Sequence, residues 1–200
     1  MQLPFADGEI KDDTSGLRLV RPAAIYLESY HAACEETWNH IHNRYILHDP
    51  AVFESWQHTI FDTFEKRYLG LELPEGYYPS LMLWAIKGER FVGAVNIRLR
   101  QDAELISYGG TVGYFITHSL RGIGLGTSIA KLGVKAAQRL GLDPIVITCQ
   151  ESNAASMAVG EHLPYLIKER DVVDVDGIVQ PIWRFWMTPK AEREALEVQR

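Results

Sequence analysis

A glycine-rich loop in the middle of the chain limits the choice of fold more than any other segment. The loop reads Arg121-Gly122-Ile123-Gly124-Leu125-Gly126-Thr127 and follows the apolar segment 111–116. A helical pattern runs from Gly124 to Leu140, and Gly141 ends it. A glycine-rich turn between a strand and a helix directs several backbone N–H groups at one point, where the helix N-terminus adds roughly half a positive charge. The loop is therefore predicted to bind a phosphate group.

The spacing of the three glycines narrows the kind of phosphate ligand. They form G-x-G-x-G, so the third glycine stands one position too early for the dinucleotide fingerprint G-x-G-x-x-G. No Lys followed by Ser or Thr comes after Gly126, which disfavours a nucleotide triphosphate loop. Arg121 adds a planar set of donors that suits a phosphate oxygen. A dinucleotide-binding protein is thus a less favoured alternative, and a glycine-rich turn in another kind of α/β protein is a second one.

Apolar residues recur at the strand period in some segments and at the helix period in others, and this pattern predicts the strands and helices. Strands are predicted at 17–21, 81–86, 91–100, 111–116, 145–149, 166–175 and 178–188, and helices at 23–38, 50–68, 124–140 and 152–163. The second helix begins with Asp49 as a cap and Pro50 in the first position. Asp176-Gly177 is a hairpin signal between the last two strands. Residues 1–16 are expected to be a loose lead-in, 17–188 one domain, and 189–200 a short charged tail helix.

Composition and charge exclude several classes of protein. The net charge of -6 argues against a dedicated nucleic-acid binder, which needs clustered Lys and Arg. No apolar run approaches about 18 residues, so no transmembrane helix is expected. The N-terminus lacks a basic start followed by an apolar segment, so no signal peptide is expected either. Cys34 and Cys149 lie far apart in the sequence, and we expect two free thiols in a cytoplasmic protein.

The loop and its flanking segments resemble a known family. The spacing R-x-x-G-x-G between strand 111–116 and helix 124–140 resembles motif A of the GNAT superfamily of N-acetyltransferases. Gly113-Tyr114-Phe115-Ile116 is similar to the family's fourth strand, and Ile147-Thr148-Cys149-x-x-x-Asn153-x-x-Ser156 to its fifth strand and next helix. The order of elements from about Leu17 to Met187 also matches. The resemblance implies an α/β (α+β) fold: a mixed, mainly antiparallel twisted sheet flanked by helices, with a cofactor cleft between splayed fourth and fifth strands.

The resemblance also implies where acetyl-CoA lies. In the family, pantetheine inserts between the two splayed strands, and the pyrophosphate rests on backbone N–H groups of the loop. The residues expected to bind the cofactor are Phe115, Ile116, Thr117, Arg121, Gly122, Ile123, Gly124, Leu125, Gly126, Thr127, Asn153 and Ser156. An alternative for Asn153 is a plain helix N-cap, a position that Asn also favours. No metal is expected, because His40, His42 and His48 have no accompanying ligands at a recognised spacing.

Proton transfer is where this sequence departs from the family. Many members carry a Tyr seven residues after the Asn to protonate the leaving thiolate, and that position here is Gly160. Several carry a Glu on the fourth strand as a base, and the corresponding position here is Thr111 or a neighbour, none of which is a carboxylate. The catalytic candidates within sequence reach are Tyr165, Glu151 and Tyr114, with Glu104 and Tyr108 as further alternatives. A backbone N–H near Phe115 or Ile116 is expected to stabilise the oxyanion.

The resulting functional hypothesis is an N-acetyltransferase. It moves the acetyl group of acetyl-CoA to a primary amine of a small molecule or peptide, by direct attack in a ternary complex. The missing Tyr and Glu leave an alternative, a catalytically silent acyl-CoA-binding module of the same fold. A nucleophilic Cys149 is disfavoured, because it ends an apolar strand and has no His beside it in the sequence. Nucleic-acid and membrane partners are not expected, whereas dimerisation is common among similar proteins, so a homodimer is a further expectation.

Overall fold

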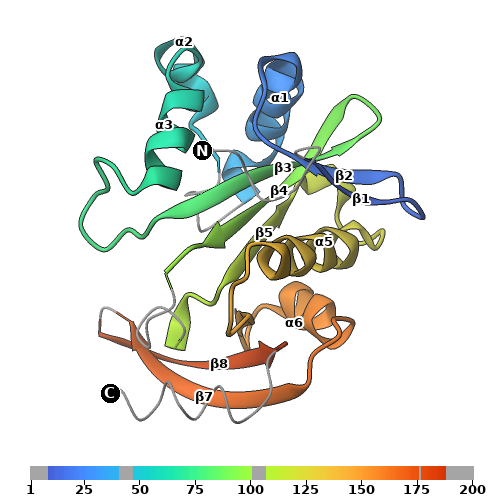
Figure 1. The fold of residues 1–200 in the computed structure, drawn as a ribbon, viewed down its shortest axis with the longest axis vertical. Coiled ribbons are helices and arrows are strands. Elements are labelled where there is room, and N and C mark those ends of the chain that lie inside the picture. The colour runs from blue at the N-terminus through green and yellow to red at the C-terminus, as the bar shows by residue number, and fades with distance from the viewer. Residues whose placement is uncertain (1–8, 41–46, 101–106, 176, 188–200) are drawn as a thin grey trace.

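The computed structural model describes residues 9–40, 47–100, 107–175 and 177–187, which form two sheets with helices around them (Figure 1). The strands are β1 (Glu9–Asp12), β2 (Leu17–Val20), β3 (Ser80–Lys87), β4 (Arg90–Arg98), β5 (Val112–Ile116), β6 (Val146–Gln150), β7 (Ile167–Val175) and β8 (Ile178–Trp186). The helices are α1 (Leu27–Thr37), α2 (Phe53–Trp56), α3 (Ile60–Leu69), α5 (Leu125–Arg139) and α6 (Ala154–Glu161). Short 3-10 turns are η1 (Ala24–Tyr26), η2 (Trp38–His40), η3 (Pro50–Val52) and η4 (His118–Leu120).

The strand order is β1-β2-β3-β4-β5 in the first sheet and β6-β8-β7 in the second. Every neighbouring pair within a sheet is antiparallel. The predicted fold class, antiparallel sheets flanked by helices, is thereby confirmed. The strands numbered fourth and fifth in the sequence pattern are β5 and β6, and each is the outer strand of its sheet. None of the helices among the described residues is long and apolar enough to cross a membrane.

The first sheet is covered on both faces, which explains why β3 reads as an unbroken apolar run. Alternate β3 side chains belong to the cluster that includes α5: Leu81, Leu83 and Ala85. The intervening ones belong to the cluster that includes α1 and α3: Met82, Trp84 and Ile86. Figure 1 shows α1 and α3 above this sheet and α5 below it. The sheet is thus the middle layer, and its last strand, β5, leads directly towards α5.

An aromatic cluster fills the layer between the sheet and α1. The Tyr30 ring stacks on Trp84 at 4.5 Å between centroids, and Phe91 meets it edge-on at 5.1 Å. The hydroxyl of Tyr30 lies 2.8 Å from Nδ1 of His48. Burial lowers the pKa of His48 to about 4, so this imidazole is neutral in the folded protein at neutral pH. These contacts hold α1 firmly on the sheet.

The structure corrects two expectations about the N-terminal part of the chain. Residues 9–12, expected within a loose lead-in, form β1, which pairs with β2 and buries Ile10 completely. Ile10 is the strand's single apolar residue, so no alternation marked it. The helix predicted over 50–68 is instead η3, α2 and α3, with a turn at 57–59. The Thr59 hydroxyl donates to the Trp56 carbonyl there, at 3.3 Å, and competes with helical hydrogen bonding. The predicted Asp49 cap is confirmed by its 3.0 Å bond from the Ala51 N–H.

Thr111 joins the two sheets through three buried hydrogen bonds. Its N–H donates to the Val146 carbonyl at 2.7 Å, and its hydroxyl donates to the Pro144 carbonyl at 3.1 Å. The same hydroxyl accepts from the Val146 N–H at 3.1 Å. The Thr111 carbonyl accepts from the Arg98 N–H of β4 at 2.9 Å, so this residue is hydrogen-bonded to a strand of each sheet.

Arginine side chains fix the segment just before this junction. Arg98 donates to the carbonyls of Gly109 and Gly110 at 2.7 and 3.0 Å. Arg184 of β8, only 5% exposed, donates to the Ser107 carbonyl at 2.9 Å. Each of these arginines comes from a different sheet. The start of β5 is therefore fastened to the start of β6, while no register pairs the two strands beyond it.

The Thr111 junction generates a prediction about stability. Thr111→Val keeps the shape of the side chain but leaves the Val146 N–H and the Pro144 carbonyl without a partner. We expect a loss of about 1–3 kcal/mol in the free energy of unfolding, measured by urea denaturation. Thr63→Val is the control, because the Thr63 hydroxyl donates to the Thr59 carbonyl at the surface. A change there within about 0.5 kcal/mol is expected. Equal stability of both variants would contradict the role given to Thr111.

Candidate functional site

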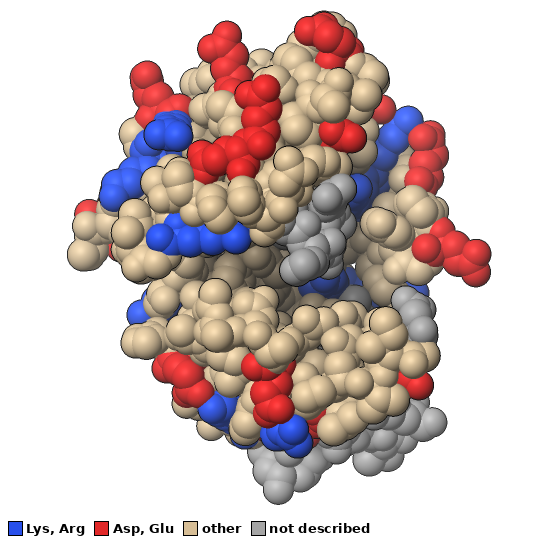
Figure 2. Space-filling model, turned by 180° about the vertical axis from the view of Figure 1, so that it is seen from behind, with Lys and Arg blue, Asp and Glu red and all other residues tan. Residues whose placement is uncertain are grey.

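A cavity of about 1620 Å³ lies between β5 and β6. Its walls are residues 112–116 of β5, the glycine-rich loop with the first turn of α5, residues 148–150 of β6, and α6. Because neighbouring residues of a strand point to opposite faces, five consecutive lining residues mean that the cavity extends around the free edge of β5. Figure 2 shows the surface hollowed at mid-height, between the part that carries α1–α3 and the part that carries β7 and β8. The predicted cleft between the two strands is present.

The glycine-rich loop forms one end of this cavity. Gly122 and Gly124 have φ of +79° and +87°, and a Cβ on either would meet nothing within 4 Å. Gly124 is the N-cap of α5 and supplies no side chain to the first-turn N–H groups of this 15-residue helix. Those donors and the positive end of the helix therefore face the open cavity. The loop fits a pyrophosphate, because its backbone donors are unoccupied and no side chain blocks them.

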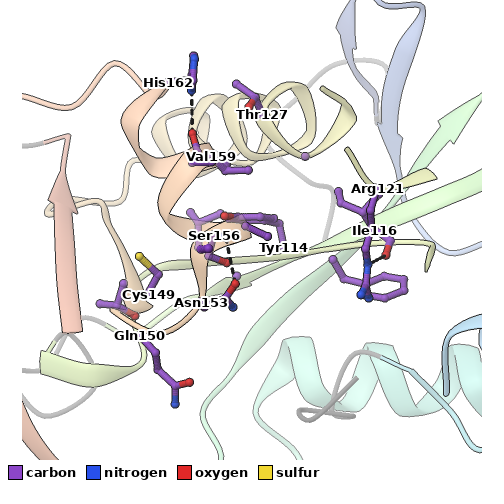
Figure 3. A pocket seen from close by; sticks show the side chains of 18 of the residues that line it. Tyr114, Ile116, Arg121, Thr127, Cys149, Gln150, Asn153, Ser156, Val159 and His162 are labelled. Atoms are coloured by element: carbon purple, nitrogen blue, oxygen red, sulfur yellow. Dashed lines mark hydrogen bonds between the residues drawn. The ribbon is translucent and has the colours of Figure 1, made fainter. Parts of the chain in front are cut away.

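The predicted loop residues divide into two groups. Arg121, Gly122, Gly124, Gly126 and Thr127 line the cavity. Ile123, which is 67% exposed, and Leu125, which is buried, are not among the lining residues, although the backbone of Leu125 opens the helix. Arg121 lies across the loop: its Nε donates to the Ile116 carbonyl at 3.4 Å and its Nη1 to the His40 carbonyl at 3.5 Å (Figure 3).

The free edge of β5 supplies backbone groups to the cavity. The Thr117 N–H donates to the Val92 carbonyl of β4 at 3.1 Å, so it points into the sheet. The Ile116 carbonyl instead accepts from Arg121, on the cavity side. Because backbone groups alternate between the two edges of a strand, Tyr114 and Ile116 present theirs to the cavity, whereas Phe115 and Thr117 present theirs to β4. Phe115 still lines the cavity with its side chain, and Thr117 does not line it.

The N-terminus of α6 faces β5 across the cavity. The Asn153 side chain accepts from the Ser156 N–H at 3.0 Å, so the N-cap alternative considered for Asn153 is observed. This bond uses the amide oxygen and leaves the amide N–H₂ for a ligand. Figure 3 shows the Tyr114 side chain reaching from β5 towards Ser156 and Asn153. Strand and helix thus place these three predicted residues together on the cavity wall.

Tyr114 carries a phenol that is buried without a hydrogen bond. Its oxygen is fully covered and has no partner among the described residues. Burial raises the pKa of Tyr114 to about 12, and the nearby Ser156 side chain acts in the opposite direction. A phenol of this pKa is protonated at neutral pH, so it can donate a hydrogen bond but cannot serve as a base. Buried polar groups without partners are rare and often belong to functional sites.

The other two catalytic candidates lie outside the lining of the cavity. Glu151 holds Arg170 in a fork at 2.7 and 3.0 Å and accepts from Trp183 at 3.1 Å. The bonds from Arg170 and then Trp183 hold the pKa of Glu151 below its ordinary value, so the carboxylate stays ionised and paired. The Tyr165 hydroxyl donates to Glu161 at 3.2 Å, and its ring lies edge-on to Phe185 at 5.3 Å. Glu104 lies outside the described residues.

The structure gives a physical reason for both departures from the family pattern. A Cβ on Gly160 would lie 2.4 Å from the Phe185 ring, which is fully buried. No larger side chain fits at Gly160 while Phe185 keeps its place. Thr111, which the sequence pattern matched to the family's Glu, is fixed in the junction between the sheets and is 1% exposed. A carboxylate there would lose two buried hydrogen bonds of the junction.

Sequence reasoning missed several residues of the cavity. Arg98 and His40 line it, although they lie 23 and 81 positions before Arg121 and carry no motif. Cys149 lines it too, and burial raises the pKa of its thiol to about 11. Among the described lining residues none is Asp or Glu, so the wall carries only positive or neutral groups. A search of the described residues for three or more His, Cys, Asp or Glu side chains able to hold a metal ion finds none.

Comparison with known proteins agrees with this geometry. The family model described as an acetyltransferase (GNAT) domain matches residues 17–164. The structure of Mycobacterium smegmatis RimJ in complex with CoA-disulfide superimposes with a TM-score of 0.65, at 16% identity, over 100% of this chain and 98% of that one. RimL, a ribosomal L7/L12 alpha-N-protein acetyltransferase in complex with coenzyme A, gives 0.62 at 15% identity, over 92% and 99%.

A third structure has another role. The microcin C7 self immunity acetyltransferase MccE, in complex with acetyl-CoA and AMP, gives a TM-score of 0.60 at 16% identity, over 92% of this chain and 99% of that one. A search of curated protein sequences finds no match. Identities this low show a shared fold, whereas the family model covers well over half of the chain. The chain therefore belongs to the GNAT family of acetyltransferases, which act with coenzyme A.

Proposed function

We propose that this protein transfers the acetyl group of acetyl-CoA to the α-amine of a peptide or protein N-terminus, by direct attack in a ternary complex. The observation that supports it best is a cavity lined by uncapped helix donors and arginines, with no carboxylate among the described lining residues. A structural neighbour of the same fold is a ribosomal L7/L12 alpha-N-protein acetyltransferase. The catalytically silent module remains the second candidate, because the positions of the family's Tyr and Glu hold Gly160 and Thr111.

In this proposal, acetyl-CoA lies along the free edge of β5. The pyrophosphate takes the N–H groups of the loop and of the first turn of α5, with Arg121 beside it. The pantetheine arm pairs with the backbone of Tyr114 and Ile116 and with the amide of Asn153. The remaining predicted residues of the cofactor set, including Ile123, Leu125 and Thr117, then support the loop and the strand end. The thioester reaches the level of Tyr114, where the cavity passes around β5.

The charge of the cavity favours an amine that loses its proton at low cost near pH 7. An α-amine has a pKa of about 7.7–8.0, so removing its proton at pH 7 costs roughly 1 kcal/mol, whereas a Lys side chain near 10.4 costs roughly 4.6 kcal/mol. A carboxylate would attract and hold an ammonium, but the described wall offers Arg98 and Arg121 instead. The proposed acceptor is therefore an N-terminal α-amine and not a Lys side chain.

The reacting groups then follow from the positions of the side chains. The amine attacks the thioester carbon, the C–S bond breaks, and the product amide loses a proton that balances the one gained by the CoA thiolate. An N–H of Tyr114 or Ile116 at the free edge of β5 faces the developing oxyanion. The protonated phenol of Tyr114 donates to the departing sulfur. Neither role requires Tyr165 or Glu151, which are held by Glu161 and by Arg170 respectively.

The placement of the pyrophosphate predicts the effect of a charged side chain in the loop. Gly124→Glu puts a carboxylate where the phosphates bind, and we expect affinity for acetyl-CoA to fall at least 100-fold in calorimetric titration. Gly141→Glu is a matched control, because Gly141 also has a positive φ, of +72°, and also has nothing within 4 Å of an added Cβ. It stands at the other end of α5, outside the cavity. Equal affinity of the two variants would remove the loop from the site.

The acceptor class is tested with one peptide that carries two different amines. Ala-Ala-Lys-Ala is prepared with its Lys side chain acetylated, or with its N-terminus acetylated, and CoA release is followed with a thiol reagent. We expect the free α-amine to react at least 10-fold faster than the free Lys side chain at pH 7. Faster reaction of the Lys side chain would contradict the acceptor proposal. No turnover of any amine, with acetyl-CoA still bound, would favour the silent module.

Tyr114→Phe tests the hydrogen bond to the departing sulfur. We expect kcat to fall about 100-fold while the Kd for acetyl-CoA stays within about threefold, because the ring is kept. The raised pKa keeps the phenol protonated through pH 10, so wild-type kcat should show no loss assignable to Tyr114 between pH 7 and 10. An unchanged kcat in the variant would exclude Tyr114 from the chemical step.

A further inference from the structure

The cavity has two faces, because neighbouring residues of a strand point in opposite directions. Val112 of β5 belongs to the cluster with α5, and so does Ile147 of β6. Tyr114 and Cys149 follow these two residues at the strand period and therefore share their face. The Cys149 Sγ lies 3.2 Å from the Met157 Sδ of α6. Two helices, α5 and α6, thus cover this face, which we call the helix face.

The opposite face of the cavity is open to solvent. Phe115 of β5 belongs to the cluster with α1, on the other side of the first sheet from α5. On β6, Thr148 and Gln150 alternate with Cys149, so they lie on the same side as Phe115. Phe115, Thr148 and Gln150 all line the cavity, and Gln150 is exposed. An acceptor can therefore reach the thioester from this open face.

Gln150 stands close to the level proposed for the thioester. The junction between the sheets pairs Thr111 with Val146, and Tyr114 and Cys149 each lie three residues beyond it. Burial and, to a smaller extent, the nearby Cys149 thiol raise the pKa of Tyr114 to about 12, so these two side chains face each other across the cavity. Gln150 is one residue further along β6, a step of about 3.3 Å. Figure 3 shows its side chain leaving the strand in the direction opposite to that of Cys149.

Both the backbone and the side chain of Gln150 are held in place. Its Nε2 donates to the Oε1 of Gln180, on β8, at 2.7 Å. Its backbone carbonyl accepts from the Asn153 N–H at 3.0 Å. Its cross-strand partner is Ile182, which is buried and also lines the cavity. The two glutamine amides therefore form a fixed pair beside an apolar part of the wall.

This pair of amides has hydrogen-bonding groups left over. Each amide carries one carbonyl oxygen and one NH₂ group, and the bond between Gln150 and Gln180 uses one of each. The remaining oxygen and NH₂ make no further hydrogen bond within the part of the chain that the structure describes. Exchanging oxygen and nitrogen in both amides leaves the same two groups, so the result does not depend on how they are assigned. One acceptor and one donor close together complement a peptide group, which offers one N–H and one C=O.

We propose that Gln150 and Gln180 bind the first peptide group of the acceptor and so select peptides over simple amines, an inference that rests on the proposed function. The α-amine nitrogen and the first peptide nitrogen are one residue apart, at most about 3.6 Å. An amine at the level of Tyr114 therefore places its peptide group at the level of Gln150. Because both amides are neutral, they bind the peptide group without adding a counter-charge that would hold the amine as an ammonium.

The experiment compares Gln150→Met with the matched control Gln57→Met. Methionine keeps the length of the side chain and removes its amide. The Gln57 amide also donates to a neighbouring side chain, that of Glu54, but Gln57 is not a lining residue. One acceptor is Ala-Ala-Lys-Ala with its Lys side chain acetylated, and the other is the same peptide with an ester oxygen in place of its first peptide N–H. Each acceptor is compared between enzymes, so any difference between the acceptors in amine pKa cancels.

We expect Gln150→Met to lower kcat/KM at least 10-fold for the peptide and less than threefold for the ester. The reason is that two neutral hydrogen bonds are lost with the peptide and at most one with the ester. The Kd for acetyl-CoA should stay within threefold of the wild-type value, because neither glutamine belongs to the proposed cofactor set. Gln57→Met should match wild type with both acceptors, and Gln180→Met should reproduce the pattern of Gln150→Met.

The outcomes separate this inference from the function on which it rests. An equal loss with the two acceptors, or no loss with the peptide, would overturn the role of the glutamine pair while leaving the acetyltransferase in place. Should Gln150→Met fail to fold, Gln180→Met makes the same test from another strand. Absence of acetylation of both acceptors by the wild-type enzyme would overturn the proposed function itself, and the recognition of the peptide group with it.

Discussion

The hydrogen bonds of Thr111 hold the two sheets together at one end of the cavity. One residue closes the first sheet, through the bond from Arg98, and holds the second sheet, through its bonds to Val146 and Pro144. Since the two sheets are joined at this point, β5 and β6 can separate further along without the molecule coming apart. The cavity is the space that this separation creates. The cavity therefore depends on Thr111, although this residue has no role in the proposed reaction.

The two ends of the cavity differ in charge, and we assign them to different ligands, the cofactor and the acceptor amine. At the loop, the uncapped start of α5 and Arg121 concentrate positive charge where an anion binds. Around Tyr114 the described lining holds a protonated phenol and free backbone donors, and no carboxylate. An amine entering there as an ammonium would find no carboxylate among the described lining residues. The proposed binding of a cofactor anion and the proposed preference for an easily deprotonated amine thus rest on the same distribution of charge.

Much of this fold can be predicted from sequence, for reasons that are local. The strand and the helix that flank the glycine-rich loop, and the strand pair β7 and β8, follow from short-range patterns, and the structure confirms these elements. β1 was missed because only Ile10 is apolar and its pairing with β2 is a tertiary effect. Glu151 was a catalytic candidate because it follows β6 directly in the sequence. Its carboxylate instead accepts hydrogen bonds from Arg170 and Trp183 of the second sheet. His40 is invisible to any motif, because the fold alone brings α1 beside the end of β5.

Gly160 and Phe185 have a consequence for how such a sequence can change over evolutionary time. Because a Cβ at position 160 would meet the Phe185 ring at 2.4 Å, the two sites are epistatic. A tyrosine at position 160 is accessible only after Phe185 has become smaller, and a smaller residue at 185 leaves a void while Gly160 persists. Either substitution made alone, at position 160 or at position 185, therefore packs worse than the present pair or the doubly changed pair. Packing against Phe185 therefore keeps Gly160 in place, and the proposed reaction has to use residues elsewhere on the wall of the cavity.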